Sequence, residues 1–92
     1  MRVPKREEVV NIQHQGKPMK AIVTGVQRRR ERRDLYDVEL LVSGEFSKGD
    51  VCYWLDASGK EIQYATIRDV AYGPWVDKPV AKIIVVAKAD GD

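Results

Sequence analysis

The sequence predicts a small, mostly antiparallel β-barrel of five or six strands that is partly open. Turn-forming residues recur at short intervals, and the segments between them are rich in Val, Ile and Tyr, a spacing typical of sandwiches and barrels. Each turn supplies a glycine, which tolerates a positive φ, or a proline, which fixes φ. The turns are Gln15-Gly16-Lys17-Pro18, Ser43-Gly44, Lys48-Gly49-Asp50, Ala57-Ser58-Gly59, Gly73-Pro74 and Lys78-Pro79.

The N-terminal segment, residues 4–15, admits two interpretations. Pro4 and Gly16 suit the start and the end of a short helix. Val9, Val10 and Ile12 are β-branched and favour a strand, which Gln15-Gly16-Lys17 would turn back onto residues 19–27. We favour the strand. Within residues 19–27, Gly25 indicates a bulge or a close backbone approach in a strongly curved sheet.

The clearest strand covers residues 35–42, where Tyr36, Val38, Leu40 and Val42 alternate with polar side chains. Residues 51–55 and 60–64 flank Ala57-Ser58-Gly59 and predict a second hairpin. Residues 66–72 do not hold a period of two, which predicts a bulge or a bend. Residues 80–87 are apolar on both faces except at Lys82, so we expect this strand to lie centrally or to be covered on both sides.

The length of 92 residues is enough for one domain, residues 1–92, and we expect residues 1–7 and 88–92 to fray. No apolar run approaches the roughly 20 residues of a membrane-spanning helix, and the charged N-terminal residues do not resemble a secretory signal. Cys52 is the only cysteine, so no internal disulfide is possible. Together these features predict a cytoplasmic protein that does not span a membrane.

A net charge of +2 conceals a division of charge along the chain. Residues 1–33 hold ten Lys or Arg against three Asp or Glu, a net charge of +7, whereas residues 34–92 hold six against eleven, a net charge of −5. Such asymmetry indicates an electrostatic partner. It equally permits the two halves to complement each other within one fold or across a homo-oligomer.

The run Arg28-Arg29-Arg30-Glu31-Arg32-Arg33 is the strongest chemical signal, because it falls where two predicted strands turn. Arginine stays protonated and binds phosphate or carboxylate oxygens two at a time. The plainer alternative is a solvated hairpin in which Glu31 and Asp34 pair with two of the five arginines. At least three guanidinium groups would still lack a partner, which favours a polyanionic ligand such as DNA or RNA over an acidic protein surface.

Three further residues complete the predicted nucleic-acid site. Lys17 and Lys20 would add charge if the first hairpin lay alongside the arginine run. Neighbours on a strand point to opposite faces, so Trp54 would be exposed, as a stacking platform for a base, if Val51, Tyr53 and Leu55 point inward. The alternative is a Trp54 covered by another strand or by the segment around Trp75, which we expect to act as a lid on the barrel end.

Little in the sequence indicates an enzyme, and nothing indicates a cofactor or a metal site. His14 and Cys52 are the only residues of their kinds and are far apart in sequence. We expect His14 to be a surface residue beside a turn and Cys52 to be a small strand hydrophobe rather than a nucleophile.

The strand lengths and the Lys48-Gly49-Asp50 turn resemble those of SH3-like and OB-like small barrels, and the second half of the chain resembles the β modules of phage head–tail joining proteins. A resemblance of this kind implies a fold and no function. The sequence therefore predicts a non-catalytic nucleic-acid-binding module. The alternative is a structural or protein-interaction module that assembles through complementary charge and sheet edges.

Overall fold

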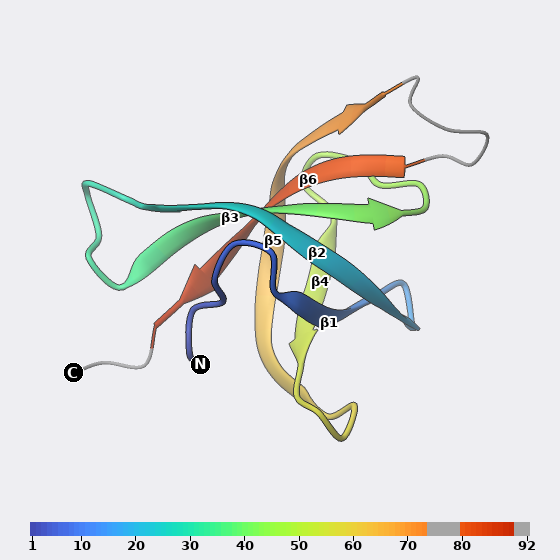
Figure 1. Cartoon of the computed structure of the whole chain (residues 1–92), viewed down its shortest axis with the longest axis horizontal. Coiled ribbons are helices and arrows are strands. Elements are labelled where there is room, and N and C mark those ends of the chain that lie inside the picture. The colour runs from blue at the N-terminus through green and yellow to red at the C-terminus, as the bar shows by residue number, and fades with distance from the viewer. Residues whose placement is uncertain (74–79, 90–92) are drawn as a thin grey trace.

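The computed structural model describes residues 1–73 and 80–89, which form a closed antiparallel barrel (Figure 1). The barrel has six strands in the order β1-β2-β3-β6-β5-β4, and no described residue is helical. None of the described elements is therefore a long apolar helix of the kind that crosses a membrane. The strands are β1 (Val9–His14), β2 (Lys17–Arg28), β3 (Leu35–Ser43), β4 (Val51–Leu55), β5 (Glu61–Tyr72) and β6 (Val80–Lys88).

The N-terminal strand closes the barrel, which corrects the prediction of a partly open one. β1 pairs with β2 across the Gln15-Gly16 turn, where both residues have a positive φ, and on its other side it pairs with β4, with His14 opposite Cys52. The pairing of β1 with β4 joins segments far apart in sequence, and no local pattern specifies it. Residues 4–15 thus contain the strand that we favoured over a helix.

Two predicted irregularities lie where the barrel bends. The register of β2 against β3 shifts between Val23 and Gly25, and that of β5 against β6 shifts between Ile67 and Asp69. Each shift inserts one unpaired residue, which bends the strand and increases its twist. A six-stranded sheet closes on itself through such bends.

The core is filled from the inward faces of all six strands. On β3 the buried residues alternate with half-buried ones, as the sequence predicted, and β6 lies between β3 and β5 with its other face only half-buried. The largest fully buried side chain is Trp54. The aliphatic side chains buried with it include Ile12, Val23, Val38, Leu40, Ile67, Ile83 and Val85.

The orientation of β4 excludes a stacking role for Trp54, so that part of the predicted nucleic-acid site is wrong. Trp54 is 1% exposed and its indole Nε1 donates to the Val86 carbonyl oxygen at 3.1 Å. The inward residues of β4 are Cys52 and Trp54, while Val51 is exposed. Leu55 is also buried, because the register shifts between Trp54 and Leu55.

The chain ahead of β1 lies against the barrel, although we expected residues 1–7 to fray. Pro4 is buried, and the backbone N–H of Glu7 donates to the Val23 carbonyl oxygen at 2.7 Å. At the other end, Ala89 N–H donates to the Asp34 carbonyl oxygen at 2.8 Å. The predicted lid residue Trp75 and residues 90–92 lie outside the described residues.

Candidate functional site

The arginine run forms the connection between β2 and β3, as the sequence predicted (Figure 1, left). Arg28 ends β2 and Leu35 begins β3. The hairpin closes through Arg29 N–H, which donates to the Leu35 carbonyl oxygen at 2.9 Å, and Leu35 N–H, which donates to the Arg32 carbonyl oxygen at 3.2 Å. The five arginines therefore extend from the end of a strand into a short, backbone-bonded turn.

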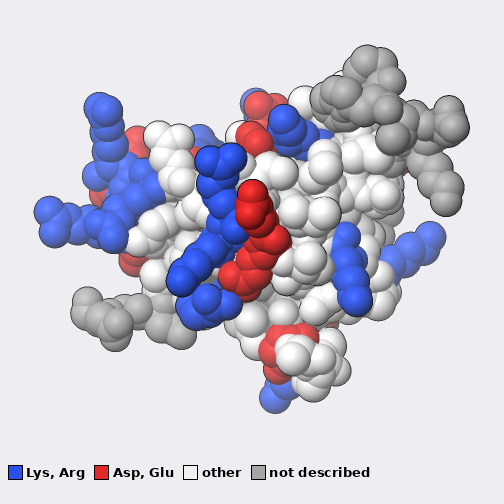
Figure 2. Space-filling model, viewed as in Figure 1, with Lys and Arg blue, Asp and Glu red and all other residues white. Residues whose placement is uncertain are grey.

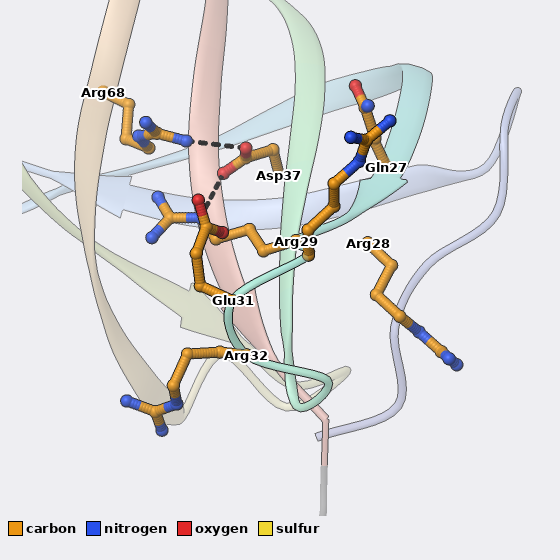
Figure 3. Close-up of a pocket in the computed structure, with 8 residues that line it drawn as sticks. Gln27, Arg28, Arg29, Glu31, Arg32, Asp37 and Arg68 are labelled. Atoms are coloured by element: carbon orange, nitrogen blue, oxygen red, sulfur yellow. Dashed lines mark hydrogen bonds and ion pairs between the residues drawn. The ribbon is translucent and has the colours of Figure 1, made fainter.

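An open pocket of about 460 Å³, the arginine pocket, lies between this hairpin and the outer face of the barrel. Its residues come from three elements, so it is a product of the fold and not of the run alone. They are Gln27, Arg28, Arg29, Arg30, Glu31 and Arg32 from the hairpin, Asp37 from β3 and Arg68 from β5 (Figure 3).

Asp37 organises one side of this pocket by binding two arginines at once. Arg29 Nε lies 3.1 Å from Asp37 Oδ1, and Arg68 Nη1 lies 2.6 Å from Asp37 Oδ2. Figure 3 shows both guanidinium groups pointing at this carboxylate, each toward a different oxygen. The Arg29 and Asp37 side chains are about one-quarter exposed and that of Arg68 is half exposed, so Arg68 keeps N–H donors open to solvent.

Arg68 is a site residue that the sequence analysis missed. It is the residue inserted by the register shift of β5, so it leaves the regular ladder and reaches across β6 to Asp37 on β3. The predicted irregularity in residues 66–72 was the only signal of its unusual position. That signal marks a bulge, which re-aims a side chain, but it does not say where the side chain points.

Arg32 is also paired, since its Nε and Nη2 donate to the two carboxylate oxygens of Asp34 at 3.1 and 2.9 Å. These hydrogen bonds lower the pKa of Asp34 from its ordinary value of 3.8. Lys88 Nζ lies 4.0 Å from the same carboxylate. The pairs of Arg29 and Arg32 both join the basic first part of the chain to the acidic second part, so part of the charge asymmetry is balanced within this fold.

Three arginines of the run have no carboxylate partner in the part of the chain that the structure describes. Arg28 donates from Nε and Nη2 to the Tyr36 hydroxyl at 3.0 and 2.8 Å, and its guanidinium lies 5.4 Å from that ring's centroid. Arg30 and Arg33 are exposed and have no ion pair among the described residues. The same holds for Glu31, which pairs with an arginine only in the plainer alternative. Within residues 1–73 and 80–89, the expectation that at least three guanidinium groups lack an acidic partner is confirmed.

The hairpin and Arg68 together carry six guanidinium groups against the three carboxylates of Glu31, Asp34 and Asp37, a net charge of +3. Figure 2 shows the blue side chains projecting at the left end of the molecule, whereas blue and red side chains lie next to each other in the middle of that face. Such an arrangement can bind phosphate oxygens through several N–H donors at once.

Lys17 and Lys20 do not belong to this site, so their predicted contribution is wrong. Lys17 begins the 12-residue strand that Arg28 ends. At about 3.3 Å per residue, Lys17 and Lys20 lie roughly 36 and 26 Å along the strand from Arg28. The first hairpin extends away from the arginine hairpin instead of lying beside it (Figure 1).

His14 and Cys52, distant in sequence, meet across β1 and β4, but their surroundings do not favour nucleophilic catalysis. His14 is 5% exposed, which corrects its expected place on the surface, and its Nε2 lies 3.0 Å from Asp50 Oδ2. Cys52 is fully buried, and burial together with the nearby Asp50 carboxylate raises the pKa of its thiol to about 11. Among residues 1–73 and 80–89, no group of His, Cys, Asp and Glu has the arrangement of a metal site.

Comparisons of the chain with models of protein families, with curated proteins and with solved structures gave no significant match.

Proposed function

We propose that this protein is a non-catalytic nucleic-acid-binding module that holds phosphates in the arginine pocket of the β2–β3 hairpin. The observation that carries the proposal is the set of guanidinium groups without a carboxylate, on Arg28, Arg30 and Arg33, beside a pocket to which Arg68 adds a further donor. A phosphodiester chain offers regularly spaced anionic oxygens, and the neutralisation of several of them accounts for most non-specific affinity.

The electrostatic energy of the hairpin without a ligand favours the binding of a polyanion. An exposed ion pair contributes only about 0 to 1 kcal/mol, so the pair of Arg32 with Asp34 stabilises the hairpin little. Uncompensated like charges within one short connection repel each other and destabilise the folded chain. A polyanion removes this repulsion and adds charge-assisted hydrogen bonds.

The test compares two variants that lose the same charge. Arg30→Gln with Arg33→Gln removes two unpaired guanidinium groups from the hairpin, and Lys17→Gln with Lys20→Gln removes two exposed ammonium groups from the far part of β2. In fluorescence anisotropy at low salt with a labelled oligonucleotide, we expect the arginine variant to bind on the order of 10-fold more weakly or worse. The lysine variant should bind within about twofold of the parent.

Replacing all five arginines of the run by glutamine should abolish binding. Equal affinities for the parent and the five-arginine variant would refute the proposal. Equal losses in the two double variants would mean that only net charge matters and that the hairpin is not the site.

A protein-interaction module remains the second candidate because of one apolar surface. Val9 is 56% exposed and Ile22, its partner across β1 and β2, is 46% exposed; both line an open pocket of about 390 Å³ with Leu41 and Val80. Closure of the barrel weakens the version of this idea that relies on free sheet edges. The remaining version is self-association through the apolar surface around Ile22. Light scattering tests it: the parent should form a discrete multimer, and Ile22→Lys should be a monomer.

A further inference from the structure

An exposed aromatic pair lies on the outer face of β4 and β5. Tyr53 and Tyr64 are directly opposite each other in the ladder, and their rings make an edge-to-face contact with centroids 5.8 Å apart and an interplanar angle of 74°. Tyr64 is 58% exposed and Tyr53 is half-buried. Their strand neighbours Trp54 and Ala65 point into the core, so the backbone fixes both tyrosines on the outside.

This pair keeps ring surface and polar groups available. An edge-to-face contact occupies one face of one ring and leaves the remaining faces uncovered by the partner ring. Neither tyrosine hydroxyl has a hydrogen-bond partner among the described residues. Six-membered aromatic rings held on a rigid strand, with free faces, are the groups on which unpaired bases stack.

Arg68 connects the tyrosine pair to the arginine pocket. The outward positions of β5 are Tyr64, Thr66 and Arg68, with Ala65 and Ile67 buried between them. At about 3.3 Å per residue, Tyr64 and Arg68 lie roughly 13 Å apart along the strand. The outward residues beside this line, Thr66 and its partner Val51, carry no charge that would repel a phosphate backbone.

We propose that the ligand of the arginine pocket is single-stranded nucleic acid, whose backbone passes from the hairpin over Arg68 and whose bases stack on Tyr64 and Tyr53. This inference rests on the function proposed above and adds the class of ligand. In a duplex the base faces are covered by neighbouring base pairs, so a stacking surface on a protein selects unpaired strands. The arginine pocket alone makes no such distinction, because both forms carry phosphates.

The experiment measures affinity for a single-stranded oligonucleotide and for a duplex of the same length, with four proteins. Tyr64→Ala removes the more exposed ring, and Tyr64→Phe keeps the ring but removes the hydroxyl. Ile62→Ala is the matched control, because Ile62 is 48% exposed and precedes Tyr64 on the same strand. The parent is the reference.

We expect Tyr64→Ala to weaken single-strand binding by about 5- to 100-fold and duplex binding by less than about twofold. Tyr64→Phe and Ile62→Ala should bind the single strand within about threefold of the parent. Equal effects of Tyr64→Ala on both ligands, or no effect on either, would overturn the inference.

The possible failures can be told apart. If the five-arginine variant loses binding while Tyr64→Ala keeps it, the arginine hairpin is a nucleic-acid site and the proposed stacking of bases on the tyrosine pair is wrong. If the parent binds neither oligonucleotide, both proposals fail. If light scattering shows that the parent is a multimer that Tyr64→Ala dissociates, the tyrosine pair is a contact between protein chains and the inference is overturned.

Discussion

At the scale of single residues, the interior of the barrel determines the chemistry of Cys52. The thiol is fully buried, and desolvation, followed by the charge of Asp50, raises its pKa to about 11. Since the thiolate is the reactive form, Cys52 should be nearly inert at neutral pH.

We therefore predict that a thiol reagent such as Ellman's reagent modifies the native protein only on the timescale of unfolding. The same reagent should modify the urea-denatured chain within seconds, which serves as the control. Fast stoichiometric modification of the native protein would contradict the burial of Cys52.

Asp50 links the 47–50 turn to His14, and its ionised form is favoured by folding. The backbone N–H of Ser47 donates to Asp50 Oδ2 at 2.9 Å, and this bond, followed by that to His14, lowers the pKa of Asp50 from 3.8. A carboxylate with a lowered folded-state pKa contributes stability above its unfolded-state pKa, and this contribution is lost as the pH falls through the folded-state value.

We predict that Asp50→Asn loses less stability than the parent when the pH falls below about 3.8. Urea midpoints measured from pH 7 to pH 2.5 test this, with Glu45→Gln, an exposed carboxylate with no ion pair among the described residues, as a control that should follow the parent. Parallel curves for the parent and Asp50→Asn would contradict the account.

At the scale of elements, β6 is held along both of its edges, because it pairs with β3 over nine residues and with β5 on its other side. Ile83 and Ile84 are adjacent residues of β6 on opposite faces. Ile83 is fully buried in the core, while Ile84 is half-buried on the outer face.

We predict that Ile83→Ala lowers the free energy of unfolding by about 2 to 5 kcal/mol, the usual range for a fully buried isoleucine. Ile84→Ala should lower the free energy of unfolding by clearly less, since water already reaches that side chain. Urea denaturation of both variants measures the difference, and equal losses would mean that the outer face of β6 is covered.

The elements were largely predictable from local patterns, whereas the site was only half predictable. Alternation identified β3, and Gly25 together with the irregular segment 66–72 marked the two bends. The arginines of the hairpin stand out in the sequence as well. Asp37 and Arg68 do not, because their contact depends on a bulge in one strand and on the pairing of two others.

Trp54 shows why it is harder to predict which face of a strand points into the core than to predict the strand itself. Within residues 51–55 both alternating sets contain apolar side chains, so alternation alone does not say which set is inside. Burial of the indole, with its N–H bonded to the Val86 carbonyl oxygen, selected one register and left Tyr53 outside.

At the scale of the whole molecule, the core and the arginine hairpin occupy different parts of the barrel. The inward faces hold the core, including the buried pair of His14 and Cys52, while the arginine hairpin projects from one end, away from the β1–β2 turn (Figure 1). This projecting position keeps the unpaired guanidinium groups accessible to a long polyanion.

The dependence of affinity on salt tests the central claim most directly, because it counts the phosphates that the protein neutralises. For single strands, the logarithm of the binding constant falls with the logarithm of the salt concentration with a slope of about −0.7 per phosphate. We predict a steep slope for the parent and a slope shallower by about 1.4 for Arg30→Gln with Arg33→Gln. Identical slopes, or no binding at low salt, would contradict the assignment of these arginines to a nucleic-acid backbone.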